Sequence, residues 1–191
     1  MIIGFGIILT AGALYAYGQY ERLVTDREPA DRVIAAGEEA PQRVRPSFPA
    51  TRVVIAKINV DSPVKEAKIE NGEWQVPKFV AGHLENTANP GDNGNVVLAG
   101  HIESISSGNV FARLDELRTG DEITLFAGDE AFQYRVTEIK VVRNDDLSVV
   151  EPTMDPTLTL ITCTGTFDVL TRDYDHRLIV IAKPSEEQRN E

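Results

Sequence analysis

The sequence predicts a mainly β domain, a closed or nearly closed mixed β-barrel with one or two short helices. From Thr51 onward, short apolar or alternating runs are separated by turn residues, which is the pattern of a sheet-rich domain. In this region the three-residue spacing of a helix face is clearest at Phe111, Leu114 and Leu117. The chain of 191 residues has room for one domain of ordinary size plus extra segments.

The N-terminal segment predicts a membrane anchor over residues 1–20. Residues 2–20 carry no charge and are mostly Ile, Leu, Phe, Ala, Gly and Tyr, and about 19 such residues can cross a bilayer as a helix. The alternatives are an uncleaved remnant of a signal peptide or a buried helix. Arg22, Arg27 and Arg32 follow the segment, so the positive-inside rule weakly favours the cytoplasm for the rest of the chain.

A linker separates this segment from the predicted domain. Residues 21–50 mix charges with several prolines and show little sustained apolar periodicity, which is typical of a stalk. We expect the folded domain over residues 51–184 and a disordered tail over residues 185–191.

Turn signals divide the predicted domain into strands. Asn71-Gly72 and Gly128-Asp129 are turn pairs, and residues 89–94 form a loop rich in Asn, Pro and Gly. The helix near Leu114 ends at Gly120. We expect strands at residues 52–58, 62–68, 74–76, 95–100, 121–126, 132–137, 139–142, 158–162 and 178–182.

Composition excludes several classes of function. A net charge of -11 argues against nucleic-acid binding and against electrostatic attachment to an anionic membrane, so any membrane attachment must be hydrophobic. A single cysteine excludes an intramolecular disulfide, and the three histidines are too far apart in sequence for a compact zinc cluster. Cys163 is therefore either a buried apolar filler or a reactive thiol.

Three ionisable side chains stand at the ends of apolar runs. Cys163 follows the run at residues 158–162, and Arg177 precedes the run at residues 178–182. A hairpin of these two runs would bring a thiol beside a guanidinium, which favours the thiolate. His101 ends a third run and would supply the acid and base that a thiol nucleophile needs.

Other residues of the same types compete for these roles. His83 precedes the loop at residues 89–94 and is expected at the surface or rim of the barrel. His176 adjoins Arg177, so strand alternation points its side chain to the opposite face. Arg172 lies in a loop with acidic neighbours and is expected to be a solvated charge.

The sequences Gly100-His101 and Thr159-Leu160-Ile161-Thr162-Cys163, followed by Arg177, resemble the sortases, which are cysteine transpeptidases of Gram-positive-type cell envelopes. The resemblance spans roughly residues 51–184 and implies an eight-stranded barrel. It implies a nucleophilic Cys163, a general acid and base His101, and an Arg177 that stabilises the oxyanion and holds the substrate. It also implies that Thr162, Gly100 and Ala99 lie near the substrate.

The same resemblance implies a function and a location. The chain would be a single-pass protein of the cell membrane with its catalytic domain outside the cytoplasm. It would cleave an LPxTG-like sorting signal of a surface protein or pilin between Thr and Gly, through a thioester. The acceptor would be an amine of a peptidoglycan precursor or a pilin lysine, with no cofactor and no metal. The loop at residues 164–168 is closest to the Gly-Pro-Phe-Asp type of some actinobacterial sortases, and the class expected is D-, E- or F-like.

Two alternative functions stay open. An L,D-transpeptidase or a papain-like peptidase would share the chemistry, but the first has a Ser-x-Gly-Cys sequence that is absent here, and the second places Cys before His. A non-catalytic module for envelope assembly would keep the barrel without activity, although the retained His101, Cys163 and Arg177 argue against it.

Overall fold

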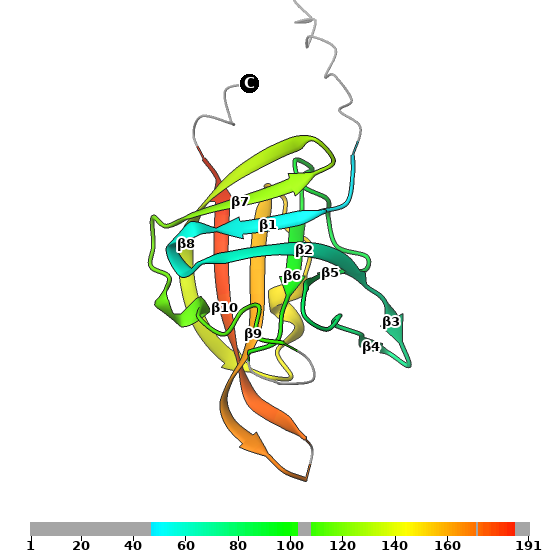
Figure 1. Cartoon of the computed structure of the whole chain (residues 1–191). Helices are drawn as coiled ribbons and strands as arrows, with labels where there is room; N and C mark the ends of the chain where they lie inside the picture. The colour runs from blue at the N-terminus through cyan, green and yellow to red at the C-terminus, as the bar shows by residue number, and fades with distance from the viewer. Residues whose placement is uncertain (1–46, 103–107, 171, 186–191) are drawn as a thin grey trace, which may run out of the picture. The chain divides into compact units, whose positions relative to one another are not determined.

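Eight strands close into a barrel in the computed structural model, which describes residues 47–102, 108–170 and 172–185 (Figure 1). Around the barrel the order is β1, β2, β5, β6, β9, β10, β8 and β7, and β7 pairs with β1 to close it. The barrel strands are β1 (Arg52–Ile55), β2 (Val60–Ala67), β5 (Ala81–Leu84), β6 (Asn95–Ala99), β7 (Glu122–Ala127), β8 (Glu130–Arg143), β9 (Thr157–Asp168) and β10 (Asp173–Pro184). The predicted eight-stranded barrel is confirmed.

The barrel mixes parallel and antiparallel pairs. β2 pairs with β5 and β6 pairs with β9 in parallel, while the other neighbours are antiparallel. Parallel pairing brings the carboxyl ends of β6 and β9 to the same edge of the sheet. Both ends therefore meet at the end of the barrel from which the β9–β10 hairpin projects (Figure 1).

Side chains of alternating strand residues fill the barrel. In β9, Leu158 and Leu160 are fully buried in the main core, and Ile161 packs in a second cluster, as expected when successive residues point to opposite faces. The second cluster contains Ala67, Leu84, Val97 and Ala99, with Trp74, Val76, Val150 and Ile161 packed against it.

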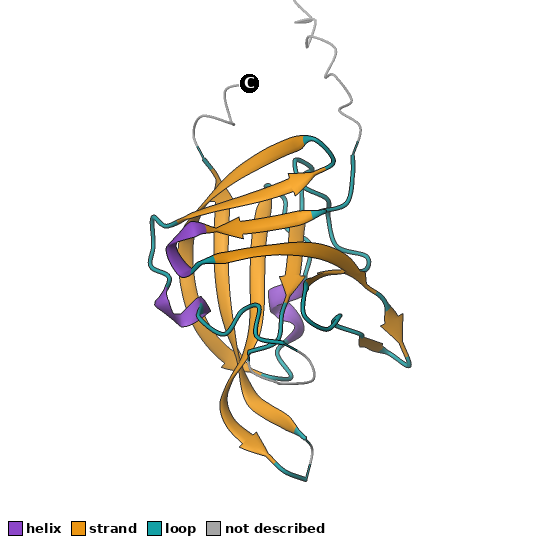
Figure 2. Cartoon of the chain, in the orientation of Figure 1, coloured by secondary structure: helices purple, strands orange, loops and turns teal. Residues whose placement is uncertain are grey.

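Two small elements accompany the second cluster outside the barrel. They are the two-stranded ribbon of β3 (Ile69–Glu70) and β4 (Glu73–Trp74) and the 3-10 helix η4 (Leu147–Val150), all visible in Figure 2. Trp74 and Val150, from the ribbon and from η4, pack against this cluster. The outer face of β6 and β9 is thus covered by side chains of both elements.

Several element boundaries differ from the sequence prediction. The strand expected at residues 52–58 ends at Ile55, because the 3-10 helix η2 (Ala56–Ile58) follows and Asn59 takes a left-handed conformation with φ 56°. The two strands expected at residues 132–137 and 139–142 are one long β8, whose pairing with β10 shifts register between Ile181 and Ala182. A bulge therefore absorbs the polar break that suggested two strands.

The helix expected around Leu114 is a single 3-10 turn, η3 (Leu114–Glu116). Leu114, Phe111 and Leu117 are all fully buried, so the spacing correctly identified a packing face. The predicted anchor and almost all of the stalk and tail lie outside the described residues. No helix among residues 47–102, 108–170 and 172–185 is long and apolar enough to span a membrane.

Candidate active site

The β9–β10 pairing places Arg177 directly opposite Cys163. Side chains at directly opposite positions of an antiparallel pair have Cβ atoms about 4.5 to 5.5 Å apart. Both residues are half-buried. The hairpin inferred from the two apolar runs therefore forms, and it brings the thiol-bearing and guanidinium-bearing residues together.

His101 follows the end of the neighbouring parallel strand. Ala99 of β6 is level with Ile161 of β9, and the Gly100 N–H donates to the Ile161 carbonyl at 3.1 Å. His101 lies two residues beyond Ala99, where β6 ends, and Cys163 lies two residues beyond Ile161. The imidazole Nε2 is 3.4 Å from the Val76 carbonyl. Sheet pairing thus brings the third candidate residue to the same end of the barrel.

Two contacts of Gly100 fix the position of the segment that leads from β6 to His101. A Cβ on Gly100 would lie 2.6 Å from Cδ2 of the buried Phe111, so only glycine allows this close packing. The Thr162 hydroxyl, buried beneath Cys163, donates to the Gly100 carbonyl at 2.7 Å. Together they fix the strand end that leads to His101 against the strand that carries Cys163.

These positions also bear on the residues expected near the substrate. Thr162 is 4% exposed and Ala99 is 8% exposed, and Gly100 is buried. The Thr162 side chain joins two strands of the barrel. Direct contact of Ala99, Gly100 and Thr162 with a substrate stays a prediction.

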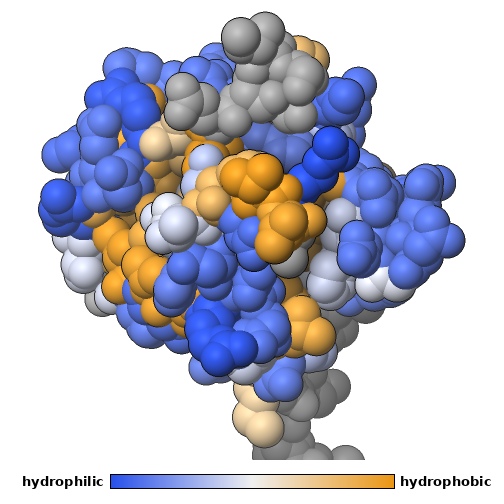
Figure 3. Space-filling model, turned by 90° about the horizontal axis from the view of Figure 1, so that it is seen from below, coloured by the Kyte–Doolittle hydropathy of each residue, from blue (hydrophilic) through white to orange (hydrophobic). Residues whose placement is uncertain are grey.

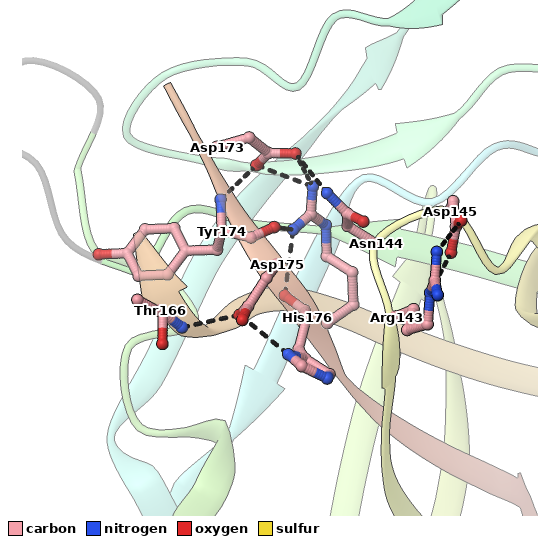
Figure 4. A network of polar contacts seen from close by, with 9 residues as sticks. Arg143, Asn144, Asp145, Thr166, Asp173, Tyr174, Asp175 and His176 are labelled. Atoms are coloured by element: carbon pink, nitrogen blue, oxygen red, sulfur yellow. Dashed lines mark hydrogen bonds and ion pairs between the residues drawn. The ribbon is translucent and has the colours of Figure 1, made fainter. Parts of the chain in front are cut away.

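The Arg177 guanidinium is held within its own hairpin. Nη2 donates to both carboxylate oxygens of Asp173, at 2.7 and 2.9 Å, and Nη1 donates to the carbonyls of Tyr174 and His176 at 2.8 and 3.0 Å. Figure 4 shows Asp173 with the amide of Asn144 beside it, and Asn144 Nδ2 donates to Asp173 at 3.3 Å. Partial burial is the largest single effect and raises the pKa of Asp173, but the hydrogen bonds and charge of Arg177, with the bonds from the Tyr174 N–H and Asn144, together lower it.

Asp175 organises the other side of the hairpin. Its Oδ1 accepts from the Thr166 N–H at 2.7 Å and lies 2.9 Å from Nδ1 of His176 (Figure 4). The hydrogen bond from His176 is the largest cause of the lowered pKa of Asp175. The same carboxylate would clash with a Cβ at Gly165, whose φ of 86° is a left-handed conformation.

Opposing effects act on the thiol. Burial raises the pKa of Cys163, the positive charge of Arg177 lowers it, and the negative charge of Asp173 raises it again, with a net upward shift. The free protein therefore favours the neutral thiol. Because Asp173 offsets Arg177, the guanidinium favours the thiolate less than it would alone.

A pocket of about 400 Å³ adjoins the thiol. It is lined by Ile102, Asn109, Phe111, Ala112, Asp115, Thr162, Cys163, Thr164, Gly165, Tyr174 and Leu178. These residues come from the connection between β6 and β7 and from the base of the β9–β10 hairpin. The nucleophile candidate thus has a hollow beside it that can hold part of a ligand.

The tip of the same hairpin is apolar and exposed. Val169 is 77% exposed and Leu170 is 94% exposed. Phe167 and Tyr174 make an edge-on ring contact across the hairpin, with centroids 5.2 Å apart. Figure 3, seen from the side on which the hairpin projects, shows apolar surface amid hydrophilic side chains.

The competing histidines and arginine lie elsewhere. The prediction that His83 is a surface or rim residue was wrong: it is 7% exposed in β5, and its Nε2 is 2.9 Å from the Ala88 carbonyl. Burial lowers the pKa of His83, which favours the neutral ring. His176 is half-exposed against Asp175, and Arg172 is exposed with φ 56°.

Sequence reasoning missed Asp173, Asp175 and Asp115. The alternation Asp173-Tyr174-Asp175 just before Arg177 is a usable signal, because two carboxylates on one strand face can meet a guanidinium. No group of three or more His, Cys, Asp or Glu side chains that could hold a metal ion occurs in the described ranges.

A thiol opposite a guanidinium, with an imidazole at the end of the adjoining strand, defines a candidate site for thiol-dependent acyl transfer in a closed β-barrel. A family model described as the sortase domain matches residues 53–185. The chain belongs to the sortase family.

Individual relatives agree with this family. Sortase D of Bacillus subtilis is 32% identical over 100 residues, which are 50% of this chain and 44% of that protein. Sortase A of Staphylococcus aureus is 25% identical over 195 residues, covering 95% of this chain and 93% of that protein. The chain spans about half of the length of the Bacillus subtilis relative or less.

Solved structures have the same fold. A Clostridium perfringens sortase D5 transpeptidase has a TM-score of 0.58 and 34% identity, covering 72% of this chain and 79% of that one. Sortase C1 of Streptococcus agalactiae has a TM-score of 0.58 and 30% identity, covering 71% of this chain and 66% of that one.

Proposed function

We propose that the chain is a cysteine transpeptidase that cleaves an LPxTG-like sorting signal between Thr and Gly and transfers the protein to an amine. The observation that carries this proposal is the pairing of Cys163 with Arg177 in a hairpin whose first strand adjoins the strand leading to His101. Membership of the sortase family supports the same chemistry.

In the first half-reaction, the Cys163 thiolate attacks the carbonyl carbon of the Thr residue in the signal. Arg177 donates hydrogen bonds to the oxyanion that forms. The carbon–nitrogen bond then breaks, and the leaving Gly amine takes a proton from protonated His101. A thioester between Cys163 and the donor protein remains.

In the second half-reaction, an amine replaces the leaving group. Its nitrogen attacks the thioester carbonyl and gives a proton to neutral His101, and the carbon–sulfur bond breaks with its electron pair on Cys163 Sγ. The thiolate and protonated His101 are restored. This cycle uses no cofactor.

The state of Arg177 adds one requirement to this scheme. Nη1 and Nη2 of its guanidinium donate to four acceptors within the hairpin, two of which are the oxygens of one carboxylate. Donation to an oxyanion therefore uses Nε or a remaining Nη2 hydrogen, or exchanges one of these acceptors for the substrate. We expect substrate binding to loosen the contact with Asp173.

For the cell, we propose a single-pass membrane protein with residues 1–20 as anchor, residues 21–50 as stalk and residues 51–184 as an extracytoplasmic catalytic domain. The uncharged apolar stretch at residues 2–20 supports the anchor. Surface proteins or pilins would be donors, and a peptidoglycan amine or pilin lysine would be the acceptor.

The direct test is to trap the acyl-enzyme. The full-length chain in detergent is mixed with a panel of quenched sorting-signal peptides, and mass spectrometry looks for a thioester on Cys163. Release of the Gly fragment together with an adduct that is lost in Cys163→Ala supports the proposal. No release from any peptide of the panel, with a folded barrel, rejects it.

One observation favours a second candidate, a non-catalytic envelope module: the raised pKa of the Cys163 thiol. An inert thiol should react with a sorting-peptide electrophile no faster than the same thiol in the unfolded chain. An enzyme should react faster when folded, because peptide binding precedes the attack.

A further inference from the structure

Two different surfaces reach the thiol of Cys163. One is the outer face of the barrel, where strand alternation puts Cys163 in line with Ile161, and where Val76 packs. The other is the pocket of about 400 Å³. The first carries the apolar Ile161 and Val76 together with Arg177, which pairs with Cys163, and the second carries polar groups, including those of Asn109 and Tyr174. A transferase that brings two substrates to one sulfur needs two approaches.

Among the described residues that line the pocket, Asp115 alone carries a formal charge. It lies in η3 and is exposed, and its carboxylate interacts with the charge of Arg113 without a hydrogen bond or ion pair to a described side chain. The nearby Arg118 is turned to the backbone, where Nη1 donates to the carbonyls of Asp115 and Leu117 at 2.7 and 2.6 Å. The described lining therefore carries one negative charge, which favours a cationic ligand near Asp115, while Arg177 lies opposite the thiol itself.

The neighbouring carboxylate behaves differently. Glu116 accepts from Nε and Nη2 of Arg113, both at 2.7 Å, and does not line the pocket. That ion pair lowers the pKa of Glu116. Two adjacent acids on one 3-10 turn thus differ in role, because one is neutralised by a partner and the other faces the space beside the nucleophile.

We propose that this pocket binds the acceptor as a primary ammonium on an aliphatic side chain, and that Asp115 is the residue that recognises the charge. The inference rests on the transpeptidase function proposed above. Phe111, Ala112 and Leu178 supply apolar wall for a methylene chain, and the volume lies in the range of small-ligand pockets.

The chemistry of transfer balances with this arrangement. The bound ammonium loses one proton to solvent. The neutral nitrogen forms the bond to the thioester carbon, the carbon–sulfur bond breaks, and the second proton goes to His101. Asp115 raises the local concentration of acceptor without taking part in formation of the thioester.

The test separates the two half-reactions in the full-length chain in detergent. Thioester formation is followed by release of the Gly fragment, and transfer is followed with Nα-acetyl-lysine amide, with triglycine and with hydroxylamine, which is uncharged at neutral pH. Asp115→Asn should raise the acceptor KM for the lysine amide about three- to tenfold. Fragment release and hydroxylamine capture should stay within about twofold of wild type.

Glu116→Gln is the matched control and should leave the lysine KM unchanged. An unchanged lysine KM in Asp115→Asn, or an equal loss with hydroxylamine, overturns the role of Asp115. Triglycine used as well as the lysine amide overturns the assignment to a side-chain amine. Absence of any thioester in the wild type instead rejects the transpeptidase function, so the two failures are distinguishable.

Discussion

Asp173 should control how readily Cys163 ionises. The substitution Asp173→Asn removes a negative charge that raises the pKa of the thiol, and it releases Nη2 of Arg177 from two contacts of 2.7 and 2.9 Å. Both changes favour the thiolate. The pKa of Cys163 should therefore fall, and the thiol should be more reactive at neutral pH than in the wild type.

The size of the effect follows from the geometry. Arg177 stands between Asp173 and Cys163, so the carboxylate is about 7 to 10 Å from the sulfur on cross-strand spacing. In an effective dielectric of about 40 to 80, one charge at that distance is worth about 0.4 to 1.2 kcal/mol. This corresponds to about a two- to eightfold higher thiolate fraction.

The assay is the rate of iodoacetamide alkylation across pH, with the adduct counted by mass spectrometry. Asp175→Asn is the control, because Asp175 contacts Thr166 and His176 and is not among the charges that shift the pKa of Cys163. An unchanged or slower rate in Asp173→Asn, or an equal rise in Asp175→Asn, would refute this account of the electrostatics.

Four further predictions concern the site, the barrel and the anchor. Cys163→Ala should abolish acyl-enzyme formation, measured by peptide cleavage. Arg177→Lys should lower turnover in the same assay by about 10²-fold or more, because the planar guanidinium is lost. Near-normal turnover of Arg177→Lys would contradict the role of Arg177 in oxyanion binding. Thr162→Val should destabilise the barrel by about 1 to 3 kcal/mol in denaturant unfolding, because the buried Gly100 carbonyl loses the hydroxyl donor, and an unchanged midpoint would argue against this contact. The full-length chain should stay in the membrane pellet in high salt, since hydrophobic burial is not screened; recovery in the wash would reject the anchor.

The barrel and its key pairings could be predicted because they follow from local patterns. The runs before Cys163, before His101 and after Arg177 have the length and composition of buried strands. Once two such runs pair, the residues at their ends must meet. The strand register that pairs Arg177 with Cys163 therefore follows from the positions of the two apolar runs next to these residues.

What could not be predicted depends on partners distant in sequence. His83 looked exposed because it lies beside a polar loop, yet it is buried in β5, between β2 and β6. The contact between Asp173 and Arg177 was missed because several carboxylates lie in the same loop, and a period-two pattern does not say which one reaches a guanidinium. Asp115 has no ion-pair partner among the described residues because Arg113 pairs with Glu116 and Arg118 donates to backbone carbonyls, and the sequence does not reveal these choices.

The three candidate residues are not held with equal firmness. Cys163 and His101 take their positions from two parallel strands of a closed barrel, joined by the Thr162 and Gly100 contacts. The side chain of Arg177 is held by hairpin residues beyond the barrel. Exchange of residues 164–175 between relatives should therefore change the position and hydrogen bonding of the guanidinium, and with them the choice of substrate. The distance between the thiol and the imidazole should stay the same, because the barrel sets it. Substrate preference can thus vary through the hairpin without any change in the barrel.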